Sequence, residues 1–319
     1  MVSSLFKPAW WLPGAHAQTI WPSLMRTPIE IETREERLTL PDGDFIDLEW
    51  TMNESDKKII VLHGLEGSIE SSYARGILKA IQDQGWQAVF MHFRGCSGEH
   101  NIEDRSYHSG ETSDIRFLID TLTTRDPNVR LCAIGYSLGG NALLKYLGET
   151  RNDSKLESAV TVSVPYKLER CSQKLKKGFS RIYQRHLVSR LLNKTRDKFI
   201  DRQPPFDLSQ LHRWKTFQLF DHHVTAPLHG FESGHDYYTQ CSSYQFLKYI
   251  TTPALLIHAL DDPFMTRDVI PKPEDLSESI QLELSNHGGH VGFVSGNTPW
   301  NAKYWLEQRI PEFLGTYLD

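Results

Sequence analysis

The chain has 319 residues and a formal net charge of −5, and apolar, charged and aromatic residues make up 39%, 24% and 11% of it. With 8 Trp, 12 Tyr and 15 Phe, this composition excludes a disordered chain, a fibrous repeat and a disulfide-stapled miniprotein. No apolar run approaches the ~20 residues that a membrane helix needs, and the proline-containing start does not resemble a secretory signal. We therefore expect a cytoplasmic globular protein, with two domains or with one large domain that carries an insertion.

Residues 1–34 are rich in Trp and Pro and show no clear hydrophobic period, so we expect an irregular arm packed on the body of the protein. Residues 37–51 then alternate between apolar and polar side chains around a turn at Pro41 to Asp44, which is typical of a β-hairpin. The run KKIIVLHG (57–64) follows, and its continuous apolar stretch is typical of a strand buried on both faces of a parallel sheet. An antiparallel pair is therefore expected to lead into a parallel sheet.

Strand and helix patterns alternate along most of the remaining chain. Further strands are predicted over 87–95, 129–137, 158–165, 252–260 and 279–285. Helices are predicted over 71–86, 112–128, 141–149 and 304–318. This alternation indicates an α/β protein with a mostly parallel sheet and crossover helices. It stops between 166 and 251, so the expected parts are the arm (1–34), a core (35–165 and 252–319) and a helical cap insertion (166–251).

The insertion also differs from the rest of the chain in charge. Between Tyr166 and Gln203 there are twelve Lys or Arg but three Asp or Glu. An amphipathic helix is predicted here, with basic residues on one side and an apolar side formed by Leu175, Phe179, Ile182, Leu187, Leu191 and Leu192. Most charged outer faces are simply solvated, and contact with an anionic membrane surface is the alternative.

The sharpest local motif is Gly-Tyr-Ser-Leu-Gly at 135–139, which has the form G-x-S-x-G. It follows an apolar strand and opens a predicted helix, and this is the setting in which such a motif forms a nucleophile elbow. Glycine is needed there because a serine on so sharp a turn leaves no room for bulky neighbours. Ser137 is therefore the candidate nucleophile, and a serine that merely caps a helix is the alternative.

A serine hydroxyl needs a base, and the base needs an orienting carboxylate. In hydrolases with a nucleophile elbow these follow in the order Ser, acid, His, after two late strands. Asp261 and Asp262 follow the strand at 252–260, and we prefer Asp262 because of its spacing from the strand end. His287 and His290 follow the last strand, and we prefer His290 because two preceding glycines let the loop fold over the serine.

The charge that develops on the substrate carbonyl oxygen needs fixed N–H donors. One usually comes from the residue after the nucleophile, which here is Leu138, and the other comes from the loop after an early strand. The loop His63 to Gly67 (HGLEG) fits that place, with the backbone N–H of Leu65 as the candidate donor. A plain turn from strand to helix is the alternative reading of this loop.

Neither a metal nor a cofactor is expected. The pairs His222-His223 and His287-x-x-His290 lack a nearby Cys or carboxylate that would complete a ligand set. The phosphate-binding motifs G-x-G-x-x-G and G-x-x-x-x-G-K-[ST] are absent. The four cysteines are widely spaced and without a C-x-x-C pair, so we expect free thiols at Cys96, Cys132, Cys171 and Cys241.

Seven segments together resemble the YheT-like group of the α/β-hydrolase superfamily (AB hydrolase family 4), bacterial relatives of a eukaryotic set with acylglycerol lipases and alcohol acyltransferases. They are HGLEGS (63–68), MHFRGCSGE (91–99), YHSGET (107–112), GYSLGGN (135–141), KGFSRIYQR (177–185), HALDDPF (258–264) and NHGGHVGF (286–293). The resemblance spans nearly the whole chain. It implies an α/β-hydrolase fold, a Ser137, Asp262 and His290 triad, and ester hydrolysis, and it leaves the substrate open.

The expected function is that of a serine hydrolase that cleaves carboxylic esters of small molecules or lipids through an acyl-enzyme, without a cofactor. The first alternative is an alcohol acyltransferase that uses the same acyl-enzyme. The second is a non-catalytic module that presents its basic cap helix to a membrane surface or a protein. Nucleic acid is not an expected partner, and the oligomeric state stays open.

Overall fold

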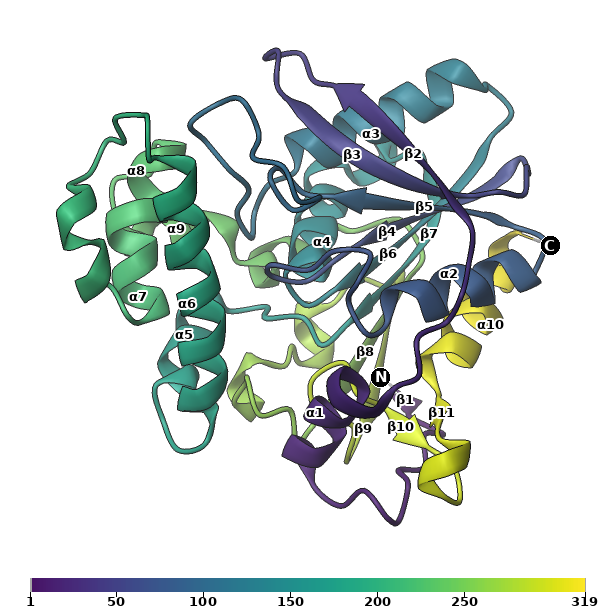
Figure 1. The fold of residues 1–319 in the computed structure, drawn as a ribbon. Helices are drawn as coiled ribbons and strands as arrows, with labels where there is room; N and C mark the ends of the chain where they lie inside the picture. Colours follow the sequence, from purple (N-terminus) through teal and green to yellow (C-terminus); the bar gives the residue numbers. More distant parts are fainter. Residues whose placement is uncertain (1, 319) are drawn as a thin grey trace.

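A computed structural model describes residues 2–318, and its centre is a nine-stranded sheet (Figure 1). The strands are β1 (Val2–Ser3), β2 (Thr33–Thr39), β3 (Phe45–Thr51), β4 (Lys57–Leu62), β5 (Gln87–His92), β6 (Arg130–Tyr136), β7 (Leu156–Val162), β8 (Ala254–Ala259) and β9 (Ile280–Ser285). Their spatial order is β1-β9-β8-β7-β6-β4-β5-β3-β2. The β3 strand runs antiparallel to both β2 and β5, and all other neighbours are parallel. The predicted mostly parallel α/β fold is confirmed.

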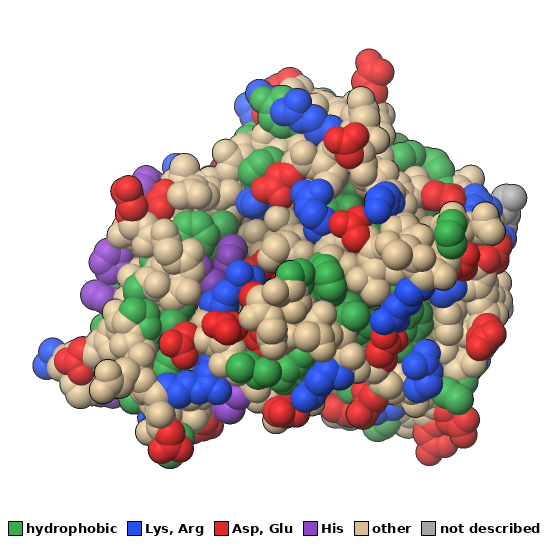
Figure 2. All heavy atoms as spheres, turned by 90° about the horizontal axis from the view of Figure 1, so that it is seen from above, with side chains coloured by type: hydrophobic (Ala, Val, Ile, Leu, Met, Phe, Trp, Pro, Cys, Tyr) green, Lys and Arg blue, Asp and Glu red, His purple; other side chains and the backbone are tan. Residues whose placement is uncertain are grey.

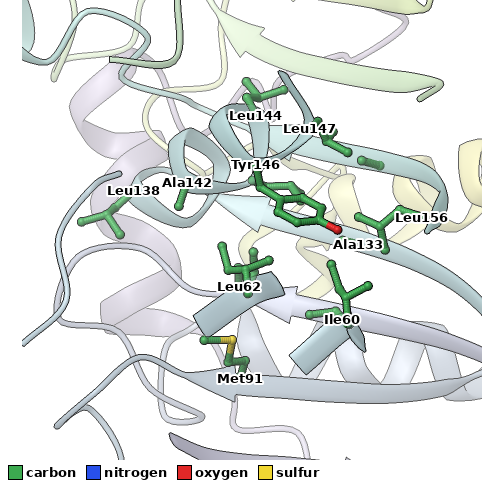
Figure 3. Packing of buried hydrophobic residues seen from close by; sticks show 14 of the residues in the cluster. Ile60, Leu62, Met91, Ala133, Leu138, Ala142, Leu144, Tyr146, Leu147 and Leu156 are labelled. Atoms are coloured by element: carbon green, nitrogen blue, oxygen red, sulfur yellow. The ribbon is translucent and has the colours of Figure 1, made fainter. Parts of the chain in front are cut away.

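Helices cover both faces of the sheet because its central strands are apolar on both sides. Ile60 and Leu62 of β4 pack under α3 (Ser113–Arg125) and α4 (Leu138–Thr150), and Figure 3 shows this layer between the sheet and α4. Ile59 and Val61 point to the opposite face, since successive side chains of a strand alternate. There they pack against α2 (Ala74–Asp83) and α10 (Leu306–Leu318).

The chain between β7 and β8 forms a helical group beside the sheet, at the left of Figure 1. Its helices are α5 (Leu168–Leu175), α6 (Ser180–Lys198), α7 (Phe217–Phe220), α8 (Ala226–His229) and α9 (Gly234–Cys241). A short 3₁₀ segment at Leu208–Arg213 and a π-helical turn at Asp221–Thr225 lie between them, and a second 3₁₀ segment at Ser243–Tyr249 leads from α9 to β8. A separate apolar cluster, which includes Val188, Leu192, Trp214 and Phe217, holds α5 to α8 together, and a smaller cluster joins Leu168 of α5 to α9. We call this group the cap.

The apolar side predicted for the cap helix is wrong at two of its six positions. Phe179 is 48% exposed and Ile182 is 56% exposed. The reason is a break in the helix, because α5 ends at Leu175 and α6 begins at Ser180 after Gly178, which has a φ of 54°. One helical period does not continue across such a break.

The amphipathic pattern predicted that the basic residues of the cap face solvent, but some of them do not. Lys198 is buried and donates hydrogen bonds to Asn101 Oδ1 and to the carbonyl of Arg105, both at 2.8 Å. Burial lowers the pKa of Lys198 to about 8. On the face of the molecule in Figure 2, basic and acidic side chains are interspersed.

The N-terminal part is more regular than the sequence predicts. Residues Ala15–Met25 form helix α1, and β1 pairs with the edge strand β9. Gln18 of α1 is buried, where its side chain bonds the backbone N–H and the carbonyl of Val294 at 2.7 and 3.0 Å. Val294 belongs to a small second sheet of β10 (Val294–Ser295) and β11 (Lys303–Tyr304). The expectation of an irregular arm is wrong for α1.

No helix within residues 2–318 combines the length and the apolar character that a membrane span requires.

The four cysteines Cys96, Cys132, Cys171 and Cys241 are free thiols.

Candidate active site

Ser137 lies on a sharp turn between β6 and α4, at the carboxyl edge of the parallel strands. Its backbone has a φ of 50° and a ψ of −113°, which a residue with a side chain rarely adopts. The turn is fixed because the Ser137 N–H donates to the Val162 carbonyl at 2.8 Å. A Cβ atom at Gly139 would lie 2.5 Å from the carbonyl oxygen of His63, so only glycine allows α4 to approach the neighbouring strand this closely.

The structure brings three of the predicted residues into one hydrogen-bonded chain. His290 Nε2 lies 3.0 Å from Ser137 Oγ, and His290 Nδ1 lies 2.8 Å from Asp262 Oδ2. Asp262 is buried, and its other oxygen accepts the backbone N–H of Phe264 at 2.8 Å. The ring of Phe264 stacks on the His290 ring with centroids 4.0 Å apart. The imidazole is thus fixed between the hydroxyl and the carboxylate.

The two alternative residues, Asp261 and His287, form a pair of their own beside this chain. His287 Nδ1 lies 3.2 Å from Asp261 Oδ2, and Asp261 Oδ1 accepts the backbone N–H of Gly289 at 3.0 Å. Their contacts support the loop that carries His290, and neither residue has a hydrogen bond to Ser137 among residues 2–318.

Helix α1 also supports this loop, a role that the sequence analysis missed. The hydroxyl of Thr19 accepts the backbone N–H of His290 at 2.9 Å and donates to the Ala15 carbonyl at 2.7 Å. The loop lies so close to α1 that a Cβ atom at Gly292 would collide with the carbonyl of Gln18. No local pattern in the sequence could have indicated this contact, because it joins residues about 270 positions apart.

Leu65 and Leu138, the predicted oxyanion donors, line the same cavity as Ser137. Within residues 2–318, neither backbone N–H has a hydrogen-bond acceptor. Leu138 is the first residue of α4, where the helix dipole favours negative charge. Both N–H groups are therefore free to bind an incoming oxygen.

The loop that carries Leu65 is held from both sides. Glu66 has a φ of 53°, its N–H donates to the Tyr107 hydroxyl at 2.7 Å, and that hydroxyl donates to Glu66 Oε1 at 2.8 Å. From the cap, Lys194 Nζ donates to the same carboxylate oxygen at 3.1 Å and Arg190 donates to the Glu66 carbonyl at 2.7 Å. Helix α6 is thus bonded directly to the loop beside Ser137.

His63, which opens this loop, has a structural role. It is fully buried, its Nε2 accepts the N–H of Phe93 at 3.1 Å, and its Nδ1 lies 2.6 Å from the carbonyl of Gly64. Burial lowers the pKa of His63 to about 3, so the ring is neutral and donates from Nδ1. Its ring fixes the loop and has no free nitrogen for proton transfer.

A cavity of about 490 Å³ opens from Ser137 into the cap, and it has the size of a small-molecule site. The core contributes Ser137 and His290 to its lining, and α1 contributes Ile20 and Leu24. The apolar side chains that α5 and α6 add include Leu175, Leu187 and Leu191. Polar cap residues line it as well, among them Arg190, Lys194, Lys198 and Asp221.

The sheet order, the strand-turn-helix at Ser137 and the His loop after the last strand define an α/β hydrolase. The family model for the alpha/beta hydrolase fold matches residues 57–297, and the chain belongs to this family. It is 44% identical over 324 residues to the protein YheT of Escherichia coli (strain K12), whose name gives esterase as its assumed activity. That match covers 99% of this chain and 95% of YheT, which confirms the resemblance to the YheT group.

More distant relatives are named as lipid hydrolases. Phospholipase ABHD3 of Homo sapiens is 27% identical over 100% of this chain and 80% of its own length. Monoacylglycerol lipase of Saccharomyces cerevisiae is 31% identical over 84% of this chain and 61% of its own. Among solved structures, the Pyrococcus furiosus esterase Pf2001 shares the fold, with a TM-score of 0.60, 16% identity and coverage of 91% and 92%. The relatives support a hydrolase of the esterase and lipase type.

Proposed function

We propose that the protein is a serine hydrolase that cleaves carboxylic esters through an acyl-enzyme. Ser137 Oγ attacks the acyl carbon while its proton passes to Nε2 of His290, and the same proton then passes to the leaving alcohol. Water next attacks the acyl-enzyme, gives a proton to His290 and releases the acid, and Ser137 recovers its proton. Asp262 holds the imidazole in the tautomer that accepts at Nε2 and stabilises its charged form.

The N–H groups of Leu65 and Leu138 bind the oxygen that becomes negative in each tetrahedral intermediate. Such donors are effective because they are fixed before the reaction, and the loss of one typically lowers kcat by about 10²- to 10³-fold. The bonds from Tyr107, Lys194 and Arg190 to Glu66 fix the Leu65 side of this arrangement.

The observation that carries the proposal is the hydrogen-bonded chain that starts at the strained Ser137. Ser137 Oγ lies 3.0 Å from Nε2 of His290, and Nδ1 of His290 lies 2.8 Å from Oδ2 of the buried Asp262. Its test is pre-steady-state hydrolysis of p-nitrophenyl esters of graded chain length. If deacylation is slower than acylation, an acyl-enzyme predicts a burst of about one nitrophenol per protein molecule. If it is not, the mechanism predicts steady turnover of at least one ester without a burst. The absence of both across the panel would contradict the proposal.

The cap, taken as residues 166–251, is proposed to act as a lid that shapes the substrate cavity, and the names of the relatives favour lipid or other small esters. Leu187 and Leu191 of α6 line the cavity, whereas Ile182 is exposed. Polar replacement of the two leucines therefore removes apolar contacts with a substrate chain.

We expect the double substitution Leu187→Ser and Leu191→Ser to lower kcat/KM for the longest accepted ester about tenfold relative to the acetate ester. The measurement is the ratio of kcat/KM values across p-nitrophenyl esters. Ile182→Ser, on the same helix but outside the cavity, is the matched control and keeps the wild-type ratio. A profile that is the same in the double variant and the wild type would exclude this lining role.

Tyr107→Phe tests the support of the oxyanion loop, because it removes one hydroxyl that both accepts from the Glu66 N–H and donates to the Glu66 carboxylate. We expect kcat to fall about tenfold with little change in KM, since a misplaced Leu65 N–H weakens transition-state binding. Tyr146→Phe, a buried tyrosine of α4, is the control. Equal effects of both substitutions on kcat would indicate a general loss of packing instead.

A further inference from the structure

A second polar site lies in the cap part of the cavity. Asp221 begins the π-helical turn Asp221–Thr225 and lines the cavity that Ser137 also lines. Its Oδ1 accepts the Thr225 hydroxyl at 2.8 Å, and its Oδ2 accepts the Tyr238 hydroxyl at 2.7 Å. The carboxylate is thereby held in one orientation by two different elements of the cap.

Within residues 2–318, this carboxylate has no cationic partner. In the described residues 2–318, its side-chain contacts are the hydroxyls of Thr225 and Tyr238, and no ion pair involves it. Burial raises the pKa of Asp221 to about 6. A half-buried carboxylate without a counter-ion tends to destabilise a fold, so its place on a cavity wall supports a binding role. A carboxylate offers about four acceptor positions, and two hydroxyls leave about two for a ligand.

The surrounding charge indicates which donor fits. The cavity lining carries three cations, Arg190, Lys194 and Lys198, against two carboxylates, those of Glu66 and Asp221. Its net charge is therefore positive and disfavours a cationic ligand, although none of the three cations contacts Asp221. A neutral hydroxyl can donate to Asp221 without that penalty. The π-helical turn adds support, because such turns are rare and occur mostly at functional sites.

We propose that Asp221 is a substrate-binding residue that accepts a hydrogen bond from a free hydroxyl of the ester substrate, away from the ester bond that is cleaved. The preferred substrates are then hydroxylated esters, with the hydroxyl on either the alcohol or the acyl part. This inference rests on the proposed function, since it assigns the substrate class of the same site.

Two matched pairs of esters test it. Glyceryl monobutyrate and propyl butyrate differ in hydroxyls on the alcohol part, and methyl 6-hydroxyhexanoate and methyl hexanoate differ on the acyl part. We expect the wild type to prefer the hydroxylated ester of at least one pair by about tenfold in kcat/KM, as a hydrogen bond to a charged acceptor allows. Asp221→Asn should reduce this preference, measured as the ratio of the two kcat/KM values, to about twofold.

Glu232→Gln, an exposed carboxylate-to-amide change in the cap, is the matched control and retains the preference. The inference is overturned if the wild type shows no preference in either pair, or if Asp221→Asn lowers both members of a pair equally. A wild-type preference for choline butyrate over 3,3-dimethylbutyl butyrate, its uncharged counterpart, would also overturn it in favour of a cation site. The wild-type comparisons hold even if the variant misfolds, and fluorophosphonate labelling of Ser137 tests the proposed function separately.

Discussion

Ser137→Ala is expected to lower kcat for any accepted ester by about 10⁴ to 10⁶, because the hydroxyl oxygen forms the bond to the acyl carbon. The remaining rate reflects binding and the oxyanion donors alone. The removal of one hydroxyl leaves the backbone bond from the Ser137 N–H to Val162 in place, so the protein is expected to stay folded. Steady-state hydrolysis of the best p-nitrophenyl ester, with a thermal unfolding curve for each protein, checks both parts.

The control for this change is Ser189→Ala, which removes an exposed hydroxyl from α6 and should leave kcat unchanged. A Ser137→Ala protein that is folded and retains more than about 1% of the wild-type kcat would assign the nucleophile to another residue.

Asp262→Asn is expected to lower kcat by up to about 10⁴ while the fold is retained. An amide at this place can donate to Nδ1 of His290, which forces the ring proton to Nε2 and leaves no acceptor for the Ser137 proton. Asp261→Asn is the matched change at the neighbouring position. It weakens the pair with exposed His287, and an amide oxygen can still accept the Gly289 N–H, so we expect less than a tenfold loss.

The measurement is kcat for the two variants on the same ester, with circular dichroism to check that both are folded. If Asp261→Asn proves the more damaging change, the acid of the proposed triad is Asp261, and the 2.8 Å contact of Asp262 with His290 would have a structural role.

The regular part of the fold was predictable because each central strand carries its own signal. A strand such as Ile59 to Leu62 is apolar at every position, and this follows from burial on both faces, independent of distant residues. The place of Ser137 was predictable for a similar reason, because the glycines around it report a local backbone constraint.

Features that depend on contacts between distant segments were not predictable. Helix α1 contains Pro22, is preceded by Gly14, which offers no side-chain cap, and buries the polar Gln18, so its pattern does not indicate a helix. The bonds from Lys194 and Arg190 to Glu66 join positions 128 and 124 residues apart. The basic pattern of the cap predicted an outward face, and the inward contacts of these side chains become apparent only in the folded chain.

The most direct test of the central claim is covalent labelling of the intact protein with a fluorophosphonate, followed by mass spectrometry of the peptides. The proposed mechanism predicts one label per protein, attached to Ser137, and slower labelling of Asp262→Asn, because the serine is activated through His290. Label on any other residue, or an unlabelled Ser137 in a folded protein, would contradict the assignment of Ser137 as the nucleophile.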